Sequence, residues 1–461
     1  MQKRNLLIII LFLFTGTIGW SAERIRQNFD FDWQFRLGEQ GIYKPVQLPH
    51  DWSIELDFNE EVGPESGYLP GGIGYYKKDF NVPASYKGKR VSIVFDGIYH
   101  KATIYLNGQE VDYHRYGYTS FETDLTPYLK YGGKNTLSVK VDHSEKSRWY
   151  TGSGIYRHVW MQVTNPIHVK MWGTYITTPR VSAESAIVSC VTTVANTSAL
   201  TGEIEIMQRI VDAQGNLLKI NGKQYAARTE VVMPENGTKD IAQSFTLSNP
   251  QLWNLEKPYL YRLETILKQK GKVIDRYTTR FGVRTIGFDK DKGFFLNGKN
   301  IKMKGACLHQ DAGCLGVAVP NRSYERRLTI LKEFGANAIR CSHNPPSPEF
   351  LNYCDSIGFL VVDEAFDKWK SGYYEQFFDE CWQQDIRDMI VRDRNHPSIV
   401  LWSIGNELAE ATRKDNVGVE RATLLRDFVH KLEPTRPTML ALAPAYQDKF
   451  ASVTDVVEIG R

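Results

Sequence analysis

Short runs of alternating hydrophobic and polar residues fill the chain from about residue 29 to residue 163. Clear examples are R-V-S-I-V-F at 90–95, K-A-T-I-Y-L at 101–106 and N-T-L-S-V-K-V-D at 135–142. A period of two is typical of β-strands with one buried face, and helical periodicity is absent. The dipeptides Asn107-Gly108 and Asp96-Gly97 predict tight reversals between such strands. Residues 28–165 are therefore predicted to form a β-sandwich.

A second all-β segment follows, at residues 166–286. Strand-like runs lie at 187–194, 202–211 and 259–269, and polar turns lie at 196–197, 215–216 and 236–237. A stretch of about 110 to 120 residues made of short antiparallel strands has the size of an immunoglobulin-like sandwich. We expect that fold here.

After Phe288 the pattern changes, and apolar strand-like segments alternate with amphipathic helix-like segments. The predicted strands lie at 301–308, 336–340, 359–363, 399–404, 438–443 and 453–459, and the predicted helices at 324–334, 347–356, 377–392 and 419–432. This alternation predicts a parallel sheet, with a (β/α)8 barrel as the leading fold. A complete barrel takes roughly 250 residues. Residues 287–461 are therefore expected to form a truncated or interrupted barrel, and the fold class is multidomain β plus α/β.

The first 22 residues read as an export signal rather than as part of a domain. Lys3 and Arg4 precede an apolar run at 6–14, and small residues follow up to Ala22. The run is too short to span a membrane stably. No cysteine lies near the expected cleavage point, so a lipid anchor is not expected. The sequence predicts a secreted, periplasmic protein without a membrane anchor.

Composition narrows the class of partner. The formal net charge is only +4, and no cluster of Lys and Arg with interleaved aromatic residues occurs, which argues against a nucleic-acid partner. The 10 Trp, 24 Tyr and 22 Phe residues are expected mainly in the cores, although aromatic faces also stack on sugars. The six cysteines are scattered without a C-x-x-C pair, so a metal cluster is not supported. Several lie inside apolar runs, which favours buried free thiols, and disulfides stay open for an exported protein.

Polar residues gather where the predicted barrel strands end. They are His309 and Asp311, then Arg340, Ser342 and His343, then Asp363, Glu364 and Asp367, and finally Asn406 and Glu407. The carboxyl ends of barrel strands meet at one mouth, so these side chains are predicted to share a pocket. A lone histidine after a strand is more often structural, but four clusters in phase favour function.

Several of these residues also have structural interpretations. Asp363 and Glu364 are interpreted first as a salt-bridging pair at the barrel rim. His396 precedes its strand and is predicted to be structural, at the end opposite the mouth. Arg340 is predicted to orient Glu407 or a neighbouring acid by bidentate pairing.

Glu407 is the strongest candidate for proton transfer. It ends the apolar run that reads W-S-I-G-N-E at 402–407. A carboxyl group at such a position is expected to be desolvated, which raises its pKa towards the range of a general acid. Asn406 offers an amide suited to a sugar hydroxyl. Retaining glycoside hydrolysis needs a second carboxylate, and the sequence offers no obvious one.

The motifs together resemble glycoside hydrolase family 2, and within it the secreted β-galactosidase-like enzymes of bacteria. The resemblance rests on L-P-H-D-W at 48–52, R-W-Y-T-G-S-G-I-Y-R at 148–157, F-G-V-R-T-I at 281–286, K-G-A-C-L-H-Q-D at 304–311, N-A-I-R-C-S-H-N-P-P at 337–346, L-V-V-D-E-A-F-D at 360–367 and W-S-I-G-N-E at 402–407. It implies a jelly-roll sugar-binding-like domain, an immunoglobulin-like sandwich and a TIM barrel. It also implies retaining hydrolysis of a terminal β-linked sugar.

The resemblance also implies roles for single residues. Glu407 matches the family's acid/base, and Asn406 matches the residue that holds the sugar 2-hydroxyl. Four further substrate-binding candidates are His309, His343, Asp51 and Arg148. The family's nucleophile is a glutamate on a later strand, so we expect it to be absent from this chain and do not assign Glu458.

No metal or other cofactor is expected. Asp367 matches a possible metal ligand, but Trp369 stands where the family would place a histidine ligand. The expected function is that of an exo-acting retaining β-glycosidase of oligo- or polysaccharides, with β-galactosidase leading and β-glucuronidase and β-mannosidase open. A catalytically dead carbohydrate-binding fragment is the alternative from another class, and the chain on its own is expected to be inactive or nearly so. A homo-oligomer stays open.

Overall fold

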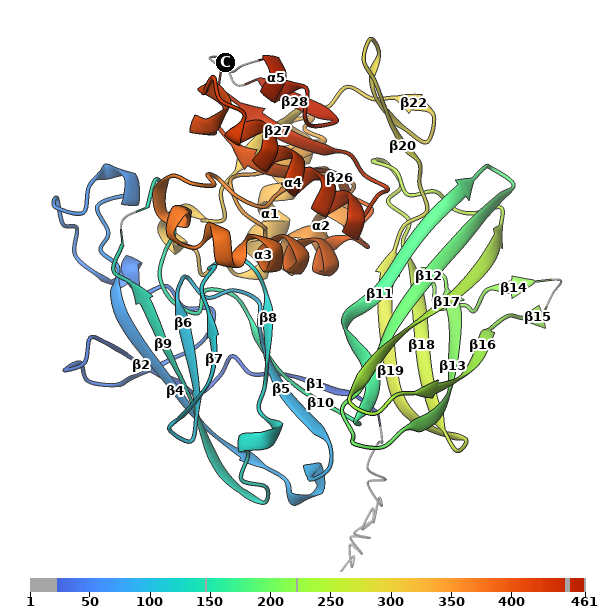
Figure 1. The fold of residues 1–461 in the computed structure, drawn as a ribbon, viewed down its shortest axis with the longest axis horizontal. Helices are drawn as coiled ribbons and strands as arrows, with labels where there is room; N and C mark the ends of the chain where they lie inside the picture. Colours follow the sequence, from blue (N-terminus) through green and yellow to red (C-terminus); the bar gives the residue numbers. More distant parts are fainter. Residues whose placement is uncertain (1–22, 146, 221–222, 444–447, 460–461) are drawn as a thin grey trace, which may run out of the picture.

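The structure is a computed structural model that describes residues 23–145, 147–220, 223–443 and 448–459. The predicted export signal, residues 1–22, lies outside the described residues. Two β-sandwiches stand side by side, and a half-open α/β barrel lies across one end of both (Figure 1). The predicted fold class is confirmed. Among the described residues no helix is long and apolar enough to cross a membrane.

The N-terminal sandwich is built from two antiparallel sheets. One sheet has the order β1 (Ile25–Asn28), β10 (Val159–Thr164), β5 (Arg90–Phe95) and β8 (Phe121–Asp124). The other has the order β3 (Lys44–Val46), β2 (Trp33–Leu37), β4 (Gly72–Val82), β9 (Gly133–His143), β6 (Ala102–Leu106) and β7 (Gln109–His114). Strand β9 alternates buried and half-buried residues along most of its length, as the sequence period predicts. The buried faces enclose one core.

The two predicted reversals of this domain have different outcomes. Asn107 and Gly108 both have positive φ, as a tight hairpin between β6 and β7 requires. The reversal predicted at Asp96-Gly97 is wrong, because the chain there leaves the sheet of β5 and crosses to the sheet of β6. Asp96 is buried and accepts a hydrogen bond from the indole of Trp160. Dipeptide chemistry alone cannot distinguish a hairpin from a crossover.

The second sandwich has the immunoglobulin-like size that the sequence predicts. Its sheets are β11 (Ile167–Val181), β12 (Ser185–Asn196) and β17 (Gly237–Ser248), and β16 (Ala227–Met233), β13 (Gly202–Val211), β18 (Tyr261–Gln269) and β19 (Lys272–Phe281). A small hairpin of β14 (Lys219–Ile220) and β15 (Lys223–Gln224) stands apart from them. In β17 every second residue from Ile241 to Leu247 is buried, so one face packs on the core and the other meets solvent.

A short antiparallel sheet that the sequence did not reveal leads into the barrel. It consists of β20 (Ile286–Asp289), β21 (Gly293–Leu296) and β22 (Lys299–Asn300). The strand predicted at 301–308 is consequently shorter, at β23 (Gly305–Leu308). The apolar residues Ile301 and Met303 misled the prediction because they pack beneath the barrel without joining its sheet.

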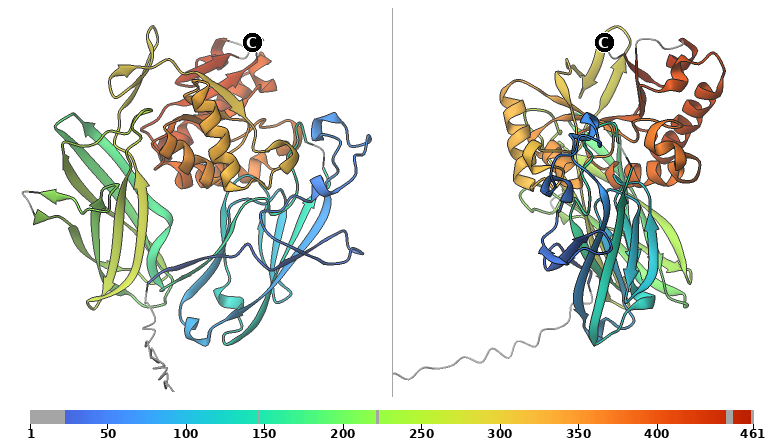
Figure 2. Two further views of the ribbon diagram at one scale, coloured as in Figure 1. Left: turned by 180° about the vertical axis from the view of Figure 1, so that it is seen from behind. Right: turned by 90° about the vertical axis from the view of Figure 1, so that its left-hand side faces the viewer.

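Six parallel strands in sequential order form the barrel sheet. After β23 they are β24 (Ala338–Cys341), β25 (Leu360–Glu364), β26 (Ile399–Asn406), β27 (Thr438–Leu442) and β28 (Val456–Ile459). The helices α1 (Asn321–Glu333), α2 (Pro348–Ile357), α3 (Phe378–Asp393), α4 (Val417–Leu432) and α5 (Asp448–Ala451) alternate with the strands. These helices lie outside the curved sheet (Figure 2). All eight residues of β26 are buried, as expected for a parallel strand covered on both faces.

Buried arginines join the first sandwich to the barrel. Arg157, next to β10, donates to the carbonyl of Pro345 at 2.8 Å. Arg392 on α3 pairs with Asp393 and donates to the hydroxyl of Ser120 at 3.0 Å. Because a buried charge without partners is costly, these contacts fix how the sandwich docks. The loop between β9 and β10 is thereby held over the barrel mouth.

Glu433 joins the immunoglobulin-like domain to the barrel. Its carboxylate is fully buried and accepts hydrogen bonds from Tyr175 on β11, at 2.8 Å, and from Trp402 on β26, at 2.9 Å. Arg436 forms an ion pair with it at 3.1 Å. Burial acts to raise the pKa of Glu433, but the charge of Arg436 and the hydrogen bonds outweigh it and lower the pKa to about 2.

We predict that Glu433→Gln lowers the free energy of unfolding at pH 7 by about 3 kcal/mol, the value that corresponds to this pKa shift. A depressed carboxyl pKa stabilises the fold above the unfolded-state value of 4.5, and this stability is lost as the pH falls through about 2. The difference between parent and variant, measured by urea unfolding, should therefore shrink as the pH falls below 4.5. The partly exposed Glu264→Gln serves as the control, with a loss below about 1 kcal/mol. A difference that does not depend on pH would contradict the assignment.

Candidate active site

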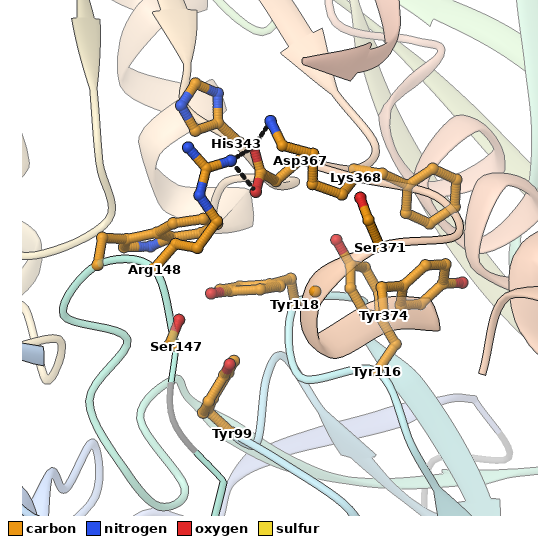
Figure 3. Close-up of a pocket in the computed structure, with 13 residues that line it drawn as sticks. Tyr99, Tyr116, Tyr118, Ser147, Arg148, His343, Asp367, Lys368, Ser371 and Tyr374 are labelled. Carbon is orange, nitrogen blue, oxygen red and sulfur yellow. Dashed lines mark hydrogen bonds and ion pairs between the residues drawn. The ribbon is translucent and has the colours of Figure 1, made fainter. Parts of the chain in front are cut away.

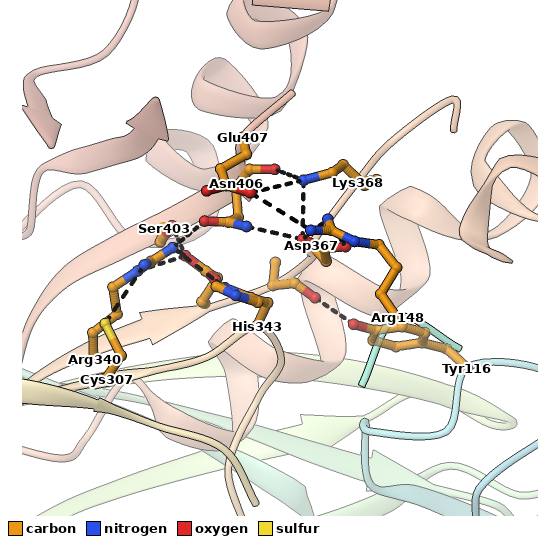
Figure 4. A network of polar contacts seen from close by, with 12 residues as sticks. Tyr116, Arg148, Cys307, Arg340, His343, Asp367, Lys368, Ser403, Asn406 and Glu407 are labelled. Carbon is orange, nitrogen blue, oxygen red and sulfur yellow. Dashed lines mark hydrogen bonds and ion pairs between the residues drawn. The ribbon is translucent and has the colours of Figure 1, made fainter. Parts of the chain in front are cut away.

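The mouth of the barrel is built around the buried carboxylate of Glu364, at the end of β25. Glu364 is fully buried, and Arg340 on β24 donates to its Oε2 from Nε at 3.1 Å and from Nη2 at 2.7 Å. Ser403 donates to the same oxygen at 2.6 Å, and Nδ1 of His343 lies 2.7 Å from Oε1 (Figure 4). The acid that Arg340 orients is therefore Glu364 and not Glu407.

Arg340 also fixes the amide of Asn406. Its Nη2 donates to Oδ1 of Asn406 at 2.8 Å, while Nδ2 of Asn406 donates to Oδ1 of Asp367 at 2.9 Å. A cation on the oxygen and a carboxylate on the nitrogen allow only one orientation of the amide group. The second hydrogen of Nδ2 stays available for a ligand.

Asp367 connects the barrel to the first sandwich. Nη1 of Arg148, in the loop between β9 and β10, lies 3.0 Å and 2.8 Å from the two carboxylate oxygens. Lys368 Nζ lies 3.2 Å from Oδ1 and donates to the backbone carbonyl of Asn406 at 2.7 Å. Arg148 and Asn406 thus both contact Asp367, although Arg148 belongs to the first sandwich and Asn406 to the barrel.

Glu407 stands at the rim of this network. Its Oε2 lies 3.5 Å from Nη2 of Arg148 and 3.9 Å from Nζ of Lys368. The backbone has φ of +43°, in the left-handed region that a side chain with a Cβ rarely adopts, and its N–H donates to the carbonyl of Ala441. Such strained positions cluster at functional sites.

One expectation about Glu407 is wrong. The sequence predicted a desolvated carboxyl group, but 52% of the side chain is exposed. The apolar run that precedes Glu407 ends at Ile404. The left-handed backbone at Glu407 then turns the Glu407 side chain out of the sheet. Among the described residues the carboxylate therefore faces water and two cations rather than an apolar pocket.

A cavity of about 160 Å³ opens beside these residues. Arg148, Asp367, Lys368 and His343 form one side of it (Figure 3). Aromatic residues line much of the rest: Tyr99, Tyr116 and Tyr118 of the first sandwich, with Phe366 and Tyr374 of the barrel. Trp149 lines the cavity beside His343, with 5.6 Å between the ring centroids. Tyr116 donates to the carbonyl of Ala365 at 2.6 Å and so holds its loop against the end of β25. An aromatic wall facing paired charges suits a ring with one apolar face and several hydroxyl groups.

His309 lies close to the cavity without joining the carboxylate network. Its ring centroid is 5.4 Å from those of both Trp149 and His343. Burial, followed by the neighbouring His343, lowers the pKa of His309, which favours the neutral ring at neutral pH. Its buried Nδ1 has no hydrogen-bond partner among the described residues. The predicted sugar contact of His309 and His343 stays a prediction.

Asp51 occupies a different place from the one expected of a substrate ligand. It is 2% exposed, and both of its oxygens already accept protein donors. The donors are the backbone N–H groups of Ser53, Ser153 and Val317 and the hydroxyl of Tyr150. Val317 belongs to the barrel, so Asp51 ties the two domains together. Burial raises the pKa of Asp51 although these donors oppose the rise. This geometry supports a structural role for Asp51.

Of the residues interpreted as structural, His396 lies where the sequence placed it. The salt-bridging rim pair expected of Asp363 and Glu364 is wrong, because Glu364 pairs with Arg340 beneath the mouth and Asp363 forms no ion pair among the described residues. His396 lies 2.6 Å from buried Asp355, at the end of the barrel opposite the mouth. Asp363 and Glu364 are both buried, but they face different neighbours. Asp363 lies near Asp393 on α3, and burial followed by that charge raises its pKa well above the ordinary value.

Among the described residues no group of three His, Cys, Asp or Glu side chains is placed to hold a metal ion. Both oxygens of Asp367, the family-based candidate ligand, are engaged by Arg148. All six cysteines are free thiols in the structure.

Comparison with known sequences agrees with this architecture. Three sequence models of one family match consecutive parts of the chain: the sugar binding domain at 30–166, a second family 2 domain at 167–284 and the TIM barrel domain at 289–456. The chain belongs to glycosyl hydrolase family 2.

Named family members give the degree of similarity. The β-galactosidase BoGH2A of Bacteroides ovatus is 44% identical over 436 residues, which is 89% of this chain and 50% of that protein. A β-glucuronidase of Bacteroides fragilis is 30% identical over 94% of this chain and 63% of its own length. A crystal structure of a family 2 member from Bacteroides cellulosilyticus has a TM-score of 0.89 and 38% identity over 94% of this chain and 58% of that one. The chain thus spans about half to two thirds of the length of these family 2 relatives.

Sequence reasoning missed part of this family 2 site. The sequence places Asp367 in the pocket and marks it as a possible metal ligand, but it does not reveal the contacts of Asp367 with Arg148 and Asn406 or the part of Lys368 and Ser403. The tyrosines of the first sandwich were assigned to the core by composition. The signals were present in the chain, since A-F-D-K at 365–368 follows a predicted strand and R-W-Y at 148–150 lies in a family motif. What was missing was the contact between the two segments.

We predict that Asp51→Asn lowers the free energy of unfolding by about 3 kcal/mol, because an amide N–H₂ would face donors that now meet a carboxylate. Urea unfolding measures the loss, and limited proteolysis of the loop around Val317 reports whether the domains separate. The exposed Asp57→Asn is the matched control and should be neutral. An Asp51→Asn protein as stable as the parent would contradict the structural role.

Proposed function

We propose that the protein is an exo-acting retaining β-glycosidase that removes terminal β-linked sugars from oligo- or polysaccharides, and that its preferred substrate is a β-galactoside. The observation that carries the proposal is Glu407, held at the end of β26 in a left-handed backbone conformation directly after an immobilised Asn406. A proton donor and a hydroxyl-binding amide at adjacent positions can act on the same sugar ring.

The proposed reaction assigns each residue a task. Glu407 protonates the glycosidic oxygen as the leaving group departs, and later removes a proton from the incoming water. Asn406 uses its remaining amide hydrogen to hold a hydroxyl beside the reacting carbon. The nucleophile of a retaining enzyme should lie about 5 to 5.5 Å from the acid/base. Glu364 and Asp367 are each paired with an arginine, so we assign neither of them as the nucleophile.

A β-galactoside is preferred over a β-glucuronide for two reasons. The relative that is 44% identical is named a β-galactosidase, whereas a protein of Formosa agariphila named a putative β-glucuronidase is 36% identical and the β-glucuronidase of Bacteroides fragilis 30%. A glucuronide carries a carboxylate that needs a cation, and the arginine and lysine side chains of the mouth network are already engaged: Arg148 and Lys368 by Asp367, and Arg340 by Glu364. The β-glucuronidase relatives still make that activity the second candidate. Export to the periplasm or beyond stays a prediction from residues 1–22.

The substrate is tested with the product of the natural gene. The initial rates on nitrophenyl β-galactoside, β-glucuronide and β-mannoside should rank the galactoside first. A higher kcat/KM on the glucuronide would replace the first candidate with the second. Saturable binding of galactose without hydrolysis of any of the three would instead favour a carbohydrate-binding protein.

We predict that Glu407→Gln lowers kcat/KM on a β-galactosyl disaccharide by about 10² to 10⁴-fold, because a sugar leaving group needs protonation. The loss of kcat/KM on nitrophenyl β-galactoside should be much smaller, because nitrophenolate leaves without a proton. The exposed Glu420→Gln on α4 is the control and should match the parent on both substrates. Equal losses on the two substrates would argue against Glu407 as the proton donor.

We predict that Arg148→Gln lowers kcat/KM on nitrophenyl β-galactoside by about 10²-fold, the scale expected when positioned groups shift by an ångström. The variant releases Asp367, which now fixes the amide of Asn406, and removes a cation from Glu407. Arg115→Gln removes an equally charged residue of the same domain, away from the network, and should be neutral. Unchanged kinetics of the Arg148 variant would show that the contacts of Arg148 with Asp367 and Glu407 contribute nothing to the reaction.

A further inference from the structure

A second cavity lies far from the barrel mouth, where the immunoglobulin-like domain meets the opposite end of the barrel. Its volume is about 290 Å³. One wall comes from β11 and from the segment after β19, and the other from the turns that precede β26 and β27 (Figure 1). Three arginines line it, one from the segment after β19 and two from the barrel: Arg284, Arg394 and Arg436.

Within the described parts of the chain, only one of these arginines has a carboxylate partner. Arg436 pairs with Glu433 at 3.1 Å. The oxygens of Glu433 also accept hydrogen bonds from Tyr175, Trp402 and Thr435. Glu433 is therefore occupied by these partners, and the described residues show no ion pair between it and Arg284 or Arg394. The nearby Asp355 is likewise occupied, by His396 and Ser398.

Arg284 is held by carbonyl groups alone. Its Nε donates to the carbonyl of Pro397 at 2.5 Å and its Nη2 to that of Ile399 at 2.6 Å. These contacts satisfy hydrogen bonds but supply no negative charge. Burial, followed by the positive charge of Arg436, lowers the pKa of Arg284. Its positive charge therefore lacks a counter-charge at contact distance among the described residues.

Arg394 is the most poorly compensated of the three. Its guanidinium lies over the ring of Tyr175, at 4.5 Å from the centroid. Its Nε is buried without a hydrogen-bond partner, and it forms no ion pair within the described parts of the chain. Asp240 and Glu433 attract it only at longer range, and burial still lowers its pKa. A buried guanidinium N–H without an acceptor is costly.

We propose that this interdomain cavity is a binding site for a compact oxyanion, sulfate or phosphate. A tetrahedral oxyanion accepts several N–H groups at once and matches the planar fork of an arginine. Two uncompensated guanidinium groups would meet the charge of a dianion. The volume leaves room for the ion and for ordered water. The site is independent of the proposed hydrolysis, because it lies at the other end of the barrel strands.

The bound ion would join the immunoglobulin-like domain to the barrel. Arg284 lies in the segment that connects the immunoglobulin-like domain to the barrel, while Arg394 directly follows α3 of the barrel. An anion that contacts both arginines replaces a repulsion between like charges with two attractions. It therefore binds the docked arrangement and stabilises the folded protein.

The direct test is isothermal titration of the whole chain with sodium sulfate and with sodium phosphate, in chloride buffer at constant ionic strength. Saturable binding to one site is expected. Arg394→Gln should weaken it by about tenfold or more, because a charge-assisted hydrogen bond is lost. The exposed Arg180→Gln, on β11 close to the cavity, removes the same charge without lining the site and should bind like the parent. Absence of saturable binding, or equal affinity in the parent and the Arg394 variant, would overturn the proposal.

A second variant tests the site by adding a negative charge to the cavity instead of removing an arginine from it. Thr285 is exposed at the edge of the cavity, and its hydrogen bonds among the described residues are made by its backbone N–H and carbonyl, both to Asn297. Thr285→Glu introduces a carboxylate of the protein's own. It should raise the melting temperature in sulfate-free buffer and abolish sulfate binding, whereas Thr285→Gln should do neither. A Thr285→Glu protein that is no more stable than the Thr285→Gln protein, and that still binds sulfate, would contradict the site.

The same titration distinguishes the possible sources of the anion. Inorganic sulfate and galactose 6-sulfate are compared as ligands of the parent and of Arg394→Gln. If both bind and compete, the site accepts sulfate esters of carbohydrates. If only the inorganic ion binds, the site accepts free anions. Failure of both would refute the proposal, and neither result depends on whether the protein hydrolyses a galactoside.

Discussion

The site depends on one constraint, the burial of a carboxyl group beneath the barrel mouth. Glu364 is fully buried, and its charge is tolerable only because Arg340, Ser403 and His343 surround it. Arg340 binds Glu364 and Asn406 together, because its Nη2 donates hydrogen bonds to both. The position of the residue next to Glu407 is therefore a consequence of how the barrel neutralises a buried acid.

The same constraint explains why the first sandwich belongs to the site. Nδ2 of Asn406 donates a hydrogen bond to Asp367, and Asp367 forms an ion pair with Arg148 of the first sandwich. Asp51 and Arg392 hold the two domains together at other points, so that Arg148 arrives at a fixed place. Glu407 is more exposed than its position in the sequence suggested. Its surroundings among the described residues are therefore polar, and its role is set by two cations and a strained backbone rather than by apolar burial.

Patterns of local origin could be predicted from the sequence, and contacts between distant segments could not. The period of two found both sandwiches, and the alternation of strands and helices found the parallel sheet with its order. Motifs at strand ends predicted that Asn406 and Glu407 lie at the barrel mouth, where the structure has them. By contrast, Asp51 lies in a family motif like Arg148 does, yet one is buried under four donors and the other reaches the mouth. The sheet of β20 to β22 and the crossover at Asp96 were missed for the same reason, because tertiary packing overrides short-range turn signals.

The most direct test of the central claim is a double-mutant cycle between Glu364 and Asn406. The values of kcat/KM on nitrophenyl β-galactoside are measured for the product of the natural gene, for Glu364→Gln, for Asn406→Ala and for the double variant, after circular dichroism has confirmed folding. If Glu364 acts by positioning Asn406 through Arg340, the loss caused by Glu364→Gln should be at least about tenfold smaller when Asn406 is already absent. Independent losses that multiply in the double variant would contradict the account.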